Sequence, residues 1–387
     1  MTSVEPSQQV GINLERREIG RIIGEAPGPT LVIVAGVHGN EPAGIAAARR
    51  VLARLEHGLA QGKMRGELVV FAGNVGALRA GVRYRAKDLN RLWTDAHVES
   101  LPSWEEGDAE DREQIELMAA IEEAMGRARG RVHLGDFHTS SAQGIPFVLF
   151  GDTLPQRQFV RAFPIPIVMG LEEQVDGVLS SYWTRRGCVT FTVEGGQHQD
   201  PASVDSLEAV LWLALEEAGL LARASLPELA RAAELLHGRR SGLPRVLEVV
   251  SRRAITEEDG FHMEPGFRNL DHAPAGQLLA RDRNGEIRAP RDGMVILPLY
   301  QGLGSDGFFW GRAVSEARMR ASELLRSLGL DRLLDFLPGV ARDPSHPSRY
   351  VVDTHVARLY PLDVFHMFGY RRIRERGAEL TLERQPG

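Results

Sequence analysis

Cysteine is almost absent from this sequence: Cys188 is the single one among 387 residues. An intrachain disulfide is therefore excluded, as is usual for proteins of a reducing compartment. Positive charge is also scarce, because 46 Lys and Arg residues face 52 Asp and Glu residues and give a net charge of −6. No global positive field is available to hold nucleic acid or an anionic membrane, so we expect neither as a partner.

Long apolar runs are missing as well. The longest, such as residues 31–37, are far shorter than the roughly 18 residues that a bilayer-spanning helix requires. The first 20 residues show neither the basic start nor the apolar stretch of a signal peptide, so we expect a soluble, cytoplasmic protein. The 43% of apolar and 25% of charged residues are an ordinary globular balance, and the length indicates two or three domains.

The first 240 residues alternate short β-branched runs with longer amphipathic stretches, a pattern typical of a layered α/β domain. The predicted strands are 31–36, 67–72, 131–137, 147–150 and 188–193, and the predicted helices are 42–55, 112–128, 203–222 and 227–236. Pro42 suits the first turn of its helix. We therefore assign residues 1–240 to one catalytic domain.

The composition changes after residue 240. Residues 241–311 are rich in glycine and break into short β-like runs, separated by turn dipeptides such as Asn284-Gly285 and Asp292-Gly293. This pattern predicts a small all-β domain. Residues 312–387 open with a helical pattern (SEARMRASELLRSLG) and contain a proline-rich stretch from Pro338 to Pro347. We treat them as a C-terminal extension with no assigned role.

A histidine and a glutamate, His38 and Glu41, stand three residues apart where a predicted strand ends and a helix begins. Nitrogen and oxygen ligands of this kind suit zinc. His138 supplies a third ligand at the end of another predicted strand. Strand alternation places Asp136 on the same face, so Asp136 either orients His138 or is a buried structural carboxylate. Three protein ligands leave a fourth position open for water, as in catalytic zinc sites, and we predict one zinc ion per chain.

Glu194 is the best candidate for a base beside the metal. It ends the predicted strand CVTFTV and precedes two glycines, which leave room around its carboxylate. Asn74 follows a fourth predicted strand. The strands that end near His38, Asn74, His138 and Glu194 each place a polar residue just past their carboxyl ends, which is where open α/β sheets bind ligands.

Residues 83–91 (RYRAKDLNR) form a basic, amide-rich loop inside an acidic chain. Arginine side chains bind carboxylates through two parallel hydrogen bonds. A small-molecule substrate with one or more carboxylates would explain why such a loop accompanies a metal site. Taken alone, Arg83 and Arg91 would more simply make surface ion pairs, and the metal and base residues favour the functional interpretation.

With these residues assembled, the sequence resembles the succinylglutamate desuccinylase and aspartoacylase family, relatives of the zinc carboxypeptidases. The resemblance spans the first 200 residues and rests on GVHGNE at 36–41, Asn74, Arg83, DLNR at 88–91, DFH at 136–138 and VEG at 193–195. It implies an α/β fold with a zinc-carboxypeptidase-like mixed sheet flanked by helices. The glycine-rich residues 241–311 are similar to the β domain that follows in this family.

The resemblance also implies roles for individual residues. His38, Glu41 and His138 would hold zinc, Glu194 would act as general base and acid, Arg83 would stabilise the oxyanion, and Asn90 and Arg91 would bind the substrate carboxylate, with Asn74 as a further substrate-binding residue. A substrate-side arginine expected shortly before the glutamate matches Arg185 or Arg186 loosely. The extension from Arg312 onward has no counterpart.

The predicted activity is zinc-dependent hydrolysis of an amide in a small, carboxylate-bearing N-acyl amino acid or similar substrate. One alternative is a carboxypeptidase-type metallopeptidase, which a narrow pocket covered by the β domain and the extension would disfavour. Another is a non-catalytic metal-dependent binding protein, which a Glu194 unable to approach the metal would favour. The sequence leaves open whether the chain forms a homo-oligomer.

Three other features have simpler interpretations. Cys188 shares a strand face with Glu194, but a buried core cysteine is the simpler assignment. Residues 302–307 (GLGSDG) spell a dinucleotide fingerprint without its strand–turn–helix context, so a turn is predicted. Five histidines show no ligand spacing and are treated as ordinary surface or core residues: His262, His272, His346, His355 and His366.

Overall fold

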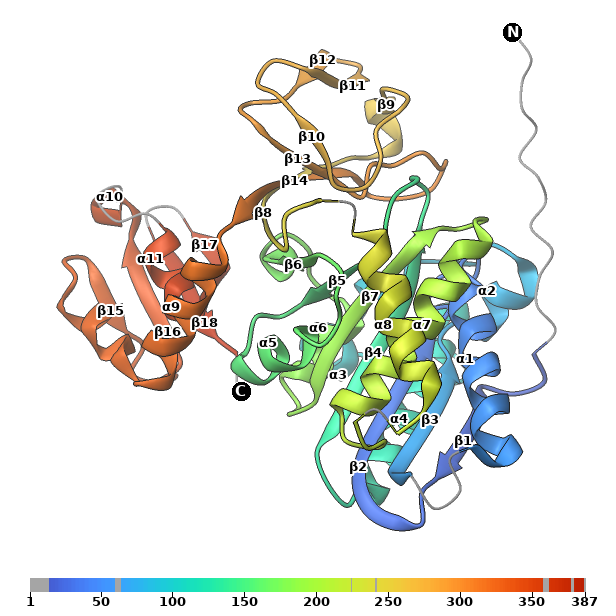
Figure 1. The fold of residues 1–387 in the computed structure, drawn as a ribbon. Helices are drawn as coiled ribbons and strands as arrows, with labels where there is room; N and C mark the ends of the chain where they lie inside the picture. Colours follow the sequence, from blue (N-terminus) through green and yellow to red (C-terminus); the bar gives the residue numbers. More distant parts are fainter. Residues whose placement is uncertain are drawn as a thin grey trace, which may run out of the picture.

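The computed structural model describes residues 14–59, 64–223, 225–240, 242–357, 362–376 and 379–385. Residues 1–13, which form most of the segment compared with a signal peptide, lie outside these ranges. A mixed 11-stranded sheet runs through the described part of the chain in the order β1-β3-β2-β4-β7-β5-β6-β8-β14-β13-β10 (Figure 1). Its strands are β1 (Glu18–Ile23), β2 (Ala26–Ala35), β3 (Arg65–Ala72), β4 (Val132–Ser140), β5 (Phe147–Phe150), β6 (Ile167–Met169), β7 (Val189–Gln197), β8 (Val246–Ala254), β10 (Asp271–Ala273), β13 (Gly293–Ile296) and β14 (Asp306–Val314).

The strands β3, β2, β4 and β7 are parallel neighbours at the centre of the first 240 residues. Residues 30–35 of β2 are buried on both faces, as expected for parallel strands covered by helices on each side. The register pairs Ala35 with Phe137 and His138 with Glu194. The carboxyl ends of β2, β4 and β7 therefore meet at one edge of the sheet.

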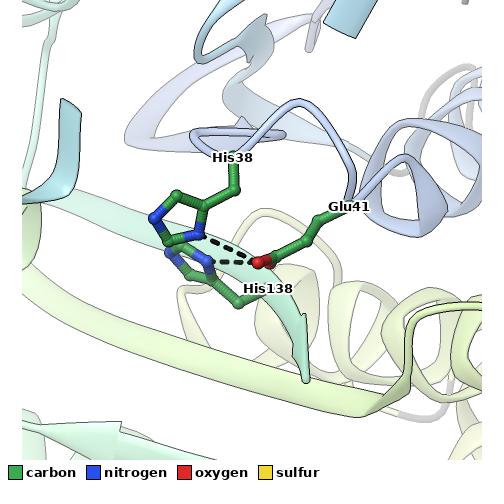
Figure 2. A group of neighbouring side chains, drawn as sticks. All are labelled: His38, Glu41 and His138. Carbon is green, nitrogen blue, oxygen red and sulfur yellow. Dashed lines mark hydrogen bonds and ion pairs between the residues drawn. The ribbon is translucent and has the colours of Figure 1, made fainter. Parts of the chain in front are cut away.

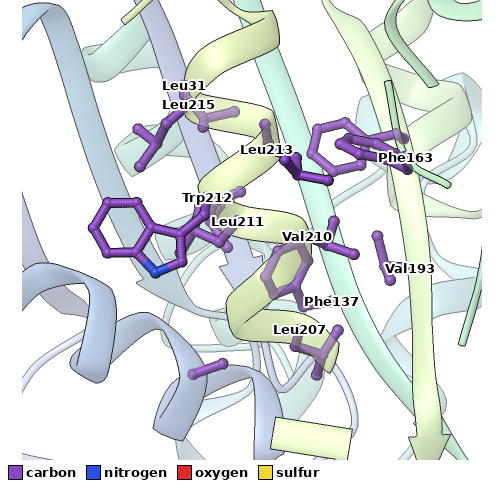
Figure 3. Close-up of a cluster of buried hydrophobic side chains, with 14 of the residues drawn as sticks. Leu31, Phe137, Phe163, Val193, Leu207, Val210, Leu211, Trp212, Leu213 and Leu215 are labelled. Carbon is purple, nitrogen blue, oxygen red and sulfur yellow. The ribbon is translucent and has the colours of Figure 1, made fainter. Parts of the chain in front are cut away.

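Helices cover both faces of this central sheet. On one face lie α1 (Ala43–Arg54), α7 (Pro201–Glu217) and α8 (Pro227–Arg239), and on the other lie α4 (Ala109–Arg127) and α6 (Leu179–Thr184). Shorter helices are α2 (Val75–Ala80), α3 (Asp95–Glu99) and α5 (Leu154–Val160). Figure 3 shows α7 against the sheet, with Leu207 and Val210 beside Phe137 and Val193. Because α7 packs on α1, α8 and β7, most of its residues are apolar.

All the strands and helices predicted in residues 1–240 are present, with ends displaced by a few residues. The predicted α/β class with a mixed sheet flanked by helices is confirmed. The short strand β6 was not predicted, because three residues carry no readable period.

The glycine-rich part of the chain continues the large sheet. Strand β8 pairs in parallel with β6, and β14, β13 and β10 add antiparallel strands beyond it. A small separate sheet contains β9 (His262–Met263), β11 (Leu278–Asp282) and β12 (Gly285–Arg288). The segment 302–305 is a loop that leads into β14 and not into a helix, so it lacks the strand–turn–helix context of a dinucleotide fingerprint.

The C-terminal extension forms its own antiparallel sheet in the order β15-β16-β18-β17. The elements are α9 (Glu316–Ser327), β15 (Val340–Arg342), β16 (Arg349–Asp353), α10 (Thr354–Ala357), α11 (Leu362–Met367), β17 (Tyr370–Arg376) and β18 (Glu379–Arg384). It lies beside β6 and α5, in orange and red in Figure 1. No helix among the described residues is long and apolar enough to cross a membrane.

Buried charges join this extension to the catalytic part of the chain. Arg371 of β17 is 3% exposed and lies 2.6 Å from an oxygen of Asp152, 2.8 Å from one of Glu173 and 3.4 Å from one of Glu248. His366 of α11 also contacts Glu173 and Glu248. Treating His366 as an ordinary histidine missed this contact, since nothing in the sequence relates α11 to β8.

Candidate metal centre and active site

The loop after β2 brings His38 and Glu41 together. Gly39 in this loop packs against α2 so closely that a Cβ atom would lie 2.1 Å from the carbonyl carbon of Ala77. The loop is therefore fixed against the helix. His38 and Glu41 are 5% and 2% exposed, and His38 Nδ1 lies 2.9 Å from Glu41 Oε1.

The third predicted ligand reaches the same carboxylate from β4. His138 Nδ1 lies 3.0 Å from Glu41 Oε2, and the backbone N–H of Thr139 donates to that oxygen at 3.0 Å. Figure 2 shows both imidazole rings turned toward Glu41. The ligand atoms of His38, Glu41 and His138 all lie within 4.8 Å of one another, as the sequence predicted for a metal site.

The Nε2 atom of each histidine contacts an aspartate. His138 Nε2 lies 2.9 Å from Asp136 Oδ2, and His38 Nε2 lies 3.0 Å from Asp88 Oδ1. A carboxylate that accepts from Nε2–H leaves the lone pair of Nδ1 free for a cation, which is the usual arrangement around protein-bound zinc. The donor set of two Nδ1 atoms and one carboxylate therefore fits zinc. Asp136 has the orienting position that the sequence allowed for it.

The charges at this centre are strongly coupled. Burial alone would raise the pKa of Glu41, but His38 and His138 hold it well below the usual value of a glutamate. Burial alone would lower the pKa of His138, but the carboxylates of Asp136 and Glu41 hold it well above that of a free imidazole. Positive charge next to Glu41 thus lowers the energy of this group, which is what a bound cation would do.

Glu194 lies across from His138 in the neighbouring strand β7. It is 8% exposed, and its Oε2 atom has no hydrogen-bond partner within the described residues. Burial and the negative charge of Glu41 raise the pKa of Glu194 to about 8, although the charge of His138 acts in the opposite direction. A carboxyl group with a pKa near neutrality can both accept and donate a proton.

Two predicted arginines reach the centre in different ways. Arg83 donates to Glu41 Oε1 over 3.5 Å and to Asp88 Oδ2 over 3.2 Å, so its guanidinium lies beside the candidate metal ligand Glu41. Arg91 donates to Asp306 Oδ2 over 2.5 Å. Asp306 also accepts from Arg252. The aspartate therefore ties Arg91 to the start of β14.

The two predicted asparagines differ in position. Asn90 Oδ1 accepts from the backbone N–H of Leu179 at 2.9 Å, and Asn90 lines the pocket described below. Asn74 is fully buried: its Oδ1 caps α2 at Ala77, and its Nδ2 donates to Glu110. Asn74 does not line the pocket, so a role in substrate binding does not fit its placement.

The two loosely matched arginines and the cysteine do not contribute to the site. Arg185 and Arg186 form ion pairs with Asp95, and Arg186 stacks on Tyr182. Neither arginine lines the pocket. Cys188 is buried, and its burial raises the pKa of the thiol to about 12, so it does not supply a thiolate near neutral pH.

A pocket opens at the three candidate metal ligands and includes Glu194. His38, Glu41, His138, Arg83, Asn90, Arg91 and Glu194 all line it. Sequence reasoning missed several other lining residues, among them His198, Glu172, Gln301 and Asp306. His198 bonds to Thr139 Oγ1 at 2.8 Å and to Gln301 at 3.3 Å. These contacts join β7 to the loop before β14, and a lone histidine in the sequence gives no signal for them.

The cover of the pocket comes from the glycine-rich part of the chain. Residues 297–299 and Gln301 of the loop before β14 lie along it. The extension contributes no lining residue within the described part of the chain, whose lining set ends at Phe309. Of the two segments whose packing over the site would disfavour a metallopeptidase, only the glycine-rich part lines the pocket among the described residues.

Comparisons with known proteins show the family of the chain. Residues 27–214 match a family model described as the succinylglutamate desuccinylase/aspartoacylase catalytic domain. A succinylglutamate desuccinylase of Burkholderia thailandensis is 31% identical over 269 residues, which cover 65% of this chain and 70% of that protein.

Solved structures show the same fold. A succinylglutamate desuccinylase/aspartoacylase from Rhodobacter sphaeroides has a TM-score of 0.56 and 18% identity, covering 76% of this chain and 88% of that chain. The ectoine utilization protein EutE (DoeB) from Ruegeria pomeroyi has a TM-score of 0.55 and 23% identity, covering 75% of this chain and 87% of that chain.

Proposed function

Because the chain belongs to the succinylglutamate desuccinylase/aspartoacylase family, we propose that it is a zinc-dependent deacylase. The substrate is a small N-acyl amino acid or a similar amide that bears a carboxylate. One observation carries this proposal: the side chains of His38, Glu41 and His138 converge in the same pocket as the carboxylate of Glu194, whose Oε2 atom has no hydrogen-bond partner among the described residues.

The ligands and the base have distinct tasks. Zinc held by His38, Glu41 and His138, one ion per chain, would supply Lewis acidity that activates water and polarises the amide carbonyl. Glu194 accepts a proton from the attacking water and then donates it to the leaving nitrogen. Arg83, whose guanidinium lies beside Glu41, stabilises the negative charge that develops on the carbonyl oxygen.

The substrate carboxylate is held on the other side of the pocket. Asn90 and Arg91 both line it, and their side chains are already fixed by Leu179 and Asp306. A pre-oriented guanidinium loses little freedom when it binds a carboxylate. Residues 297–299 and Gln301 bound the pocket on one side, which favours a small substrate over the chain terminus that a carboxypeptidase must admit.

The test is amino-acid release from N-acyl amino acids by the zinc-loaded protein and by Glu194→Gln. The glutamine keeps the shape and leaves the metal ligands untouched but cannot take the proton from water, so the rate should fall by about 10²- to 10⁴-fold. Zinc content and circular dichroism should stay as in the wild type. Rates within a few-fold of the wild type would show that Glu194 is not the base, and hydrolysis of peptides but not of N-acyl amino acids would favour the peptidase.

A further inference from the structure

One wall of the pocket beyond the metal ligands is apolar. We call it the apolar wall, and it consists of Leu149, Leu171, Val175, Val178 and Phe309. Leu149, Val175 and Phe309 belong to a buried hydrophobic cluster, and Leu171 and Val178 pack against that cluster. The wall is therefore backed by packed core and is already formed without a ligand.

The apolar wall adjoins the predicted carboxylate site. Leu179, which follows Val178, donates its backbone N–H to Asn90. Gly177 packs so closely that a Cβ atom would lie 2.2 Å from the carbonyl oxygen of Arg91. An amino acid carries its carboxylate and its side chain on the same carbon atom. When Arg91 and Asn90 hold the carboxylate, the side chain therefore lies beside the apolar wall.

The cations of the pocket are already paired. The guanidinium groups that line it, within the described residues, are those of Arg83 and Arg91. Arg83 is shared between Glu41 and Asp88, and Arg91 is paired with Asp306. Arg91 would hold the first carboxylate and Arg83 would face the developing oxyanion, so a second carboxylate on the same substrate would find no further guanidinium among the described lining residues.

An acid, Glu172, lines the pocket next to Leu171 of the apolar wall. The side chain of Glu172 is 8% exposed and lies 3.8 Å from Arg371, and its Oε1 atom has no hydrogen-bond partner in the described part of the chain. Burial raises the pKa of Glu172 to about 7. Above neutral pH its ionised form would repel a negatively charged side chain.

From these contacts we infer a specificity, which rests on the proposed deacylase function: the enzyme prefers N-acyl amino acids with an aliphatic or aromatic side chain and discriminates against those with an acidic side chain. An apolar side chain gains free energy by leaving water for the apolar wall. A side-chain carboxylate at the same place would lose its water without gaining a partner.

The first experiment compares substrates that share one acyl group. N-Acetyl-leucine, -glutamine, -glutamate and -glycine, and the matching N-succinyl series, are assayed with the zinc-loaded wild type at pH 7.5. Within each series, leucine should exceed glutamate at least 10-fold in kcat/KM. Glutamine, which has the size of glutamate without its charge, should also exceed glutamate, and glycine gives the value without a side chain.

The outcomes separate this specificity from the proposed function. If the kcat/KM for the N-acyl-glutamate equals or exceeds that for the N-acyl-leucine, the inferred specificity is wrong and the deacylase function still stands. If the zinc-bound protein hydrolyses none of the compounds, both the deacylase function and the specificity are wrong.

A substitution in the wall gives a second test. Leu171→Phe places a larger side chain at the wall and should reduce the leucine-to-glycine ratio of kcat/KM at least 5-fold. Leu324→Phe is the matched control, because Leu324 is 59% exposed on α9, away from the pocket. An unchanged ratio in a folded, zinc-binding Leu171→Phe would mean that substrate side chains do not meet this wall, and it would overturn the inference.

Discussion

Asp136 Oδ2 lies 2.9 Å from Nε2 of His138, while the opposite ring nitrogen, Nδ1, faces Glu41. Both residues are buried in β4, two positions apart, so strand alternation places them on one face. The negative charge of Asp136 favours a proton on Nε2 of His138, and this would leave Nδ1 free to bind a metal.

Asp136→Asn should weaken zinc binding without abolishing it. The amide keeps the size and an acceptor oxygen but loses the negative charge, and the loss of such a partner typically costs about 10- to 100-fold in metal affinity. Competition with a fluorescent zinc chelator measures the change. His38→Ala and His138→Ala, which remove ligands outright, should lose nearly all zinc. Full zinc occupancy in either alanine variant would contradict the assignment of the metal centre.

Substitutions of Arg83 and Arg91 should change different kinetic parameters. Arg91→Lys keeps the charge but loses the planar two-pronged contact, so it should mainly raise KM. Arg83→Ala removes a charge beside the reacting carbonyl and should mainly lower kcat. A substrate whose carboxylate is amidated should bind the wild type more weakly, with a smaller penalty in Arg91→Ala. Equal processing of acids and carboxylate-free amides would contradict the carboxylate-binding role of Arg91.

The parts of the site that could be predicted follow from strand periodicity. His38, His138 and Glu194 stand at the ends of runs whose apolar pattern marks buried parallel strands, and parallel strands end at a common edge. Asn74 follows such a strand too, but its side chain caps α2, and the sequence does not distinguish a helix cap from a ligand-binding amide.

The contacts that could not be predicted join distant parts of the chain. Arg91 and Asp306 are separated by 215 positions, and their pairing depends on how β14 docks beside the pocket. The pairing of β6 with β8, through which the sheet continues, could not be predicted either. The composition changes between the two segments whether or not their strands pair. The buried cluster around Arg371 joins segments more than 100 residues apart.

Loss of His366 should change how stability depends on pH. Burial and the charge of Arg371 lower the pKa of His366, but its contacts with Glu173 and Glu248 raise it overall above that of a free histidine. Asp363 lies nearby as well. The stabilisation from protonated His366 is therefore complete below about pH 6.5 and disappears as pH rises through the higher pKa of the folded state.

The wild type and His366→Gln should therefore differ most in Tm near pH 6 and least near pH 9. His346→Gln is the control, since the side chain of His346 is 51% exposed. At acid pH a second effect applies to the wild type: contacts with His366 and Arg371 outweigh burial and lower the pKa of Glu173 to about 2. Its stabilisation is present above about pH 4.5 and falls as the pH approaches 2. A Tm difference that is constant from pH 6 to 9 would contradict the role of His366.

Arg371→Met should destabilise the protein far more than a surface arginine substitution does. It would leave Asp152, Glu173 and Glu248 buried with less positive charge, and breaking a buried ion pair in this way costs about 3–5 kcal/mol. Arg320→Met is the matched control: Arg320 is 76% exposed and pairs with Glu316 at 3.5 Å, and exposed pairs contribute at most about 1 kcal/mol. Urea unfolding followed by tryptophan fluorescence gives both values. Because Glu173 ends the short helical turn that carries the pocket residues Leu171 and Glu172, Arg371→Met should also raise KM, whereas a purely peripheral extension would leave KM unchanged.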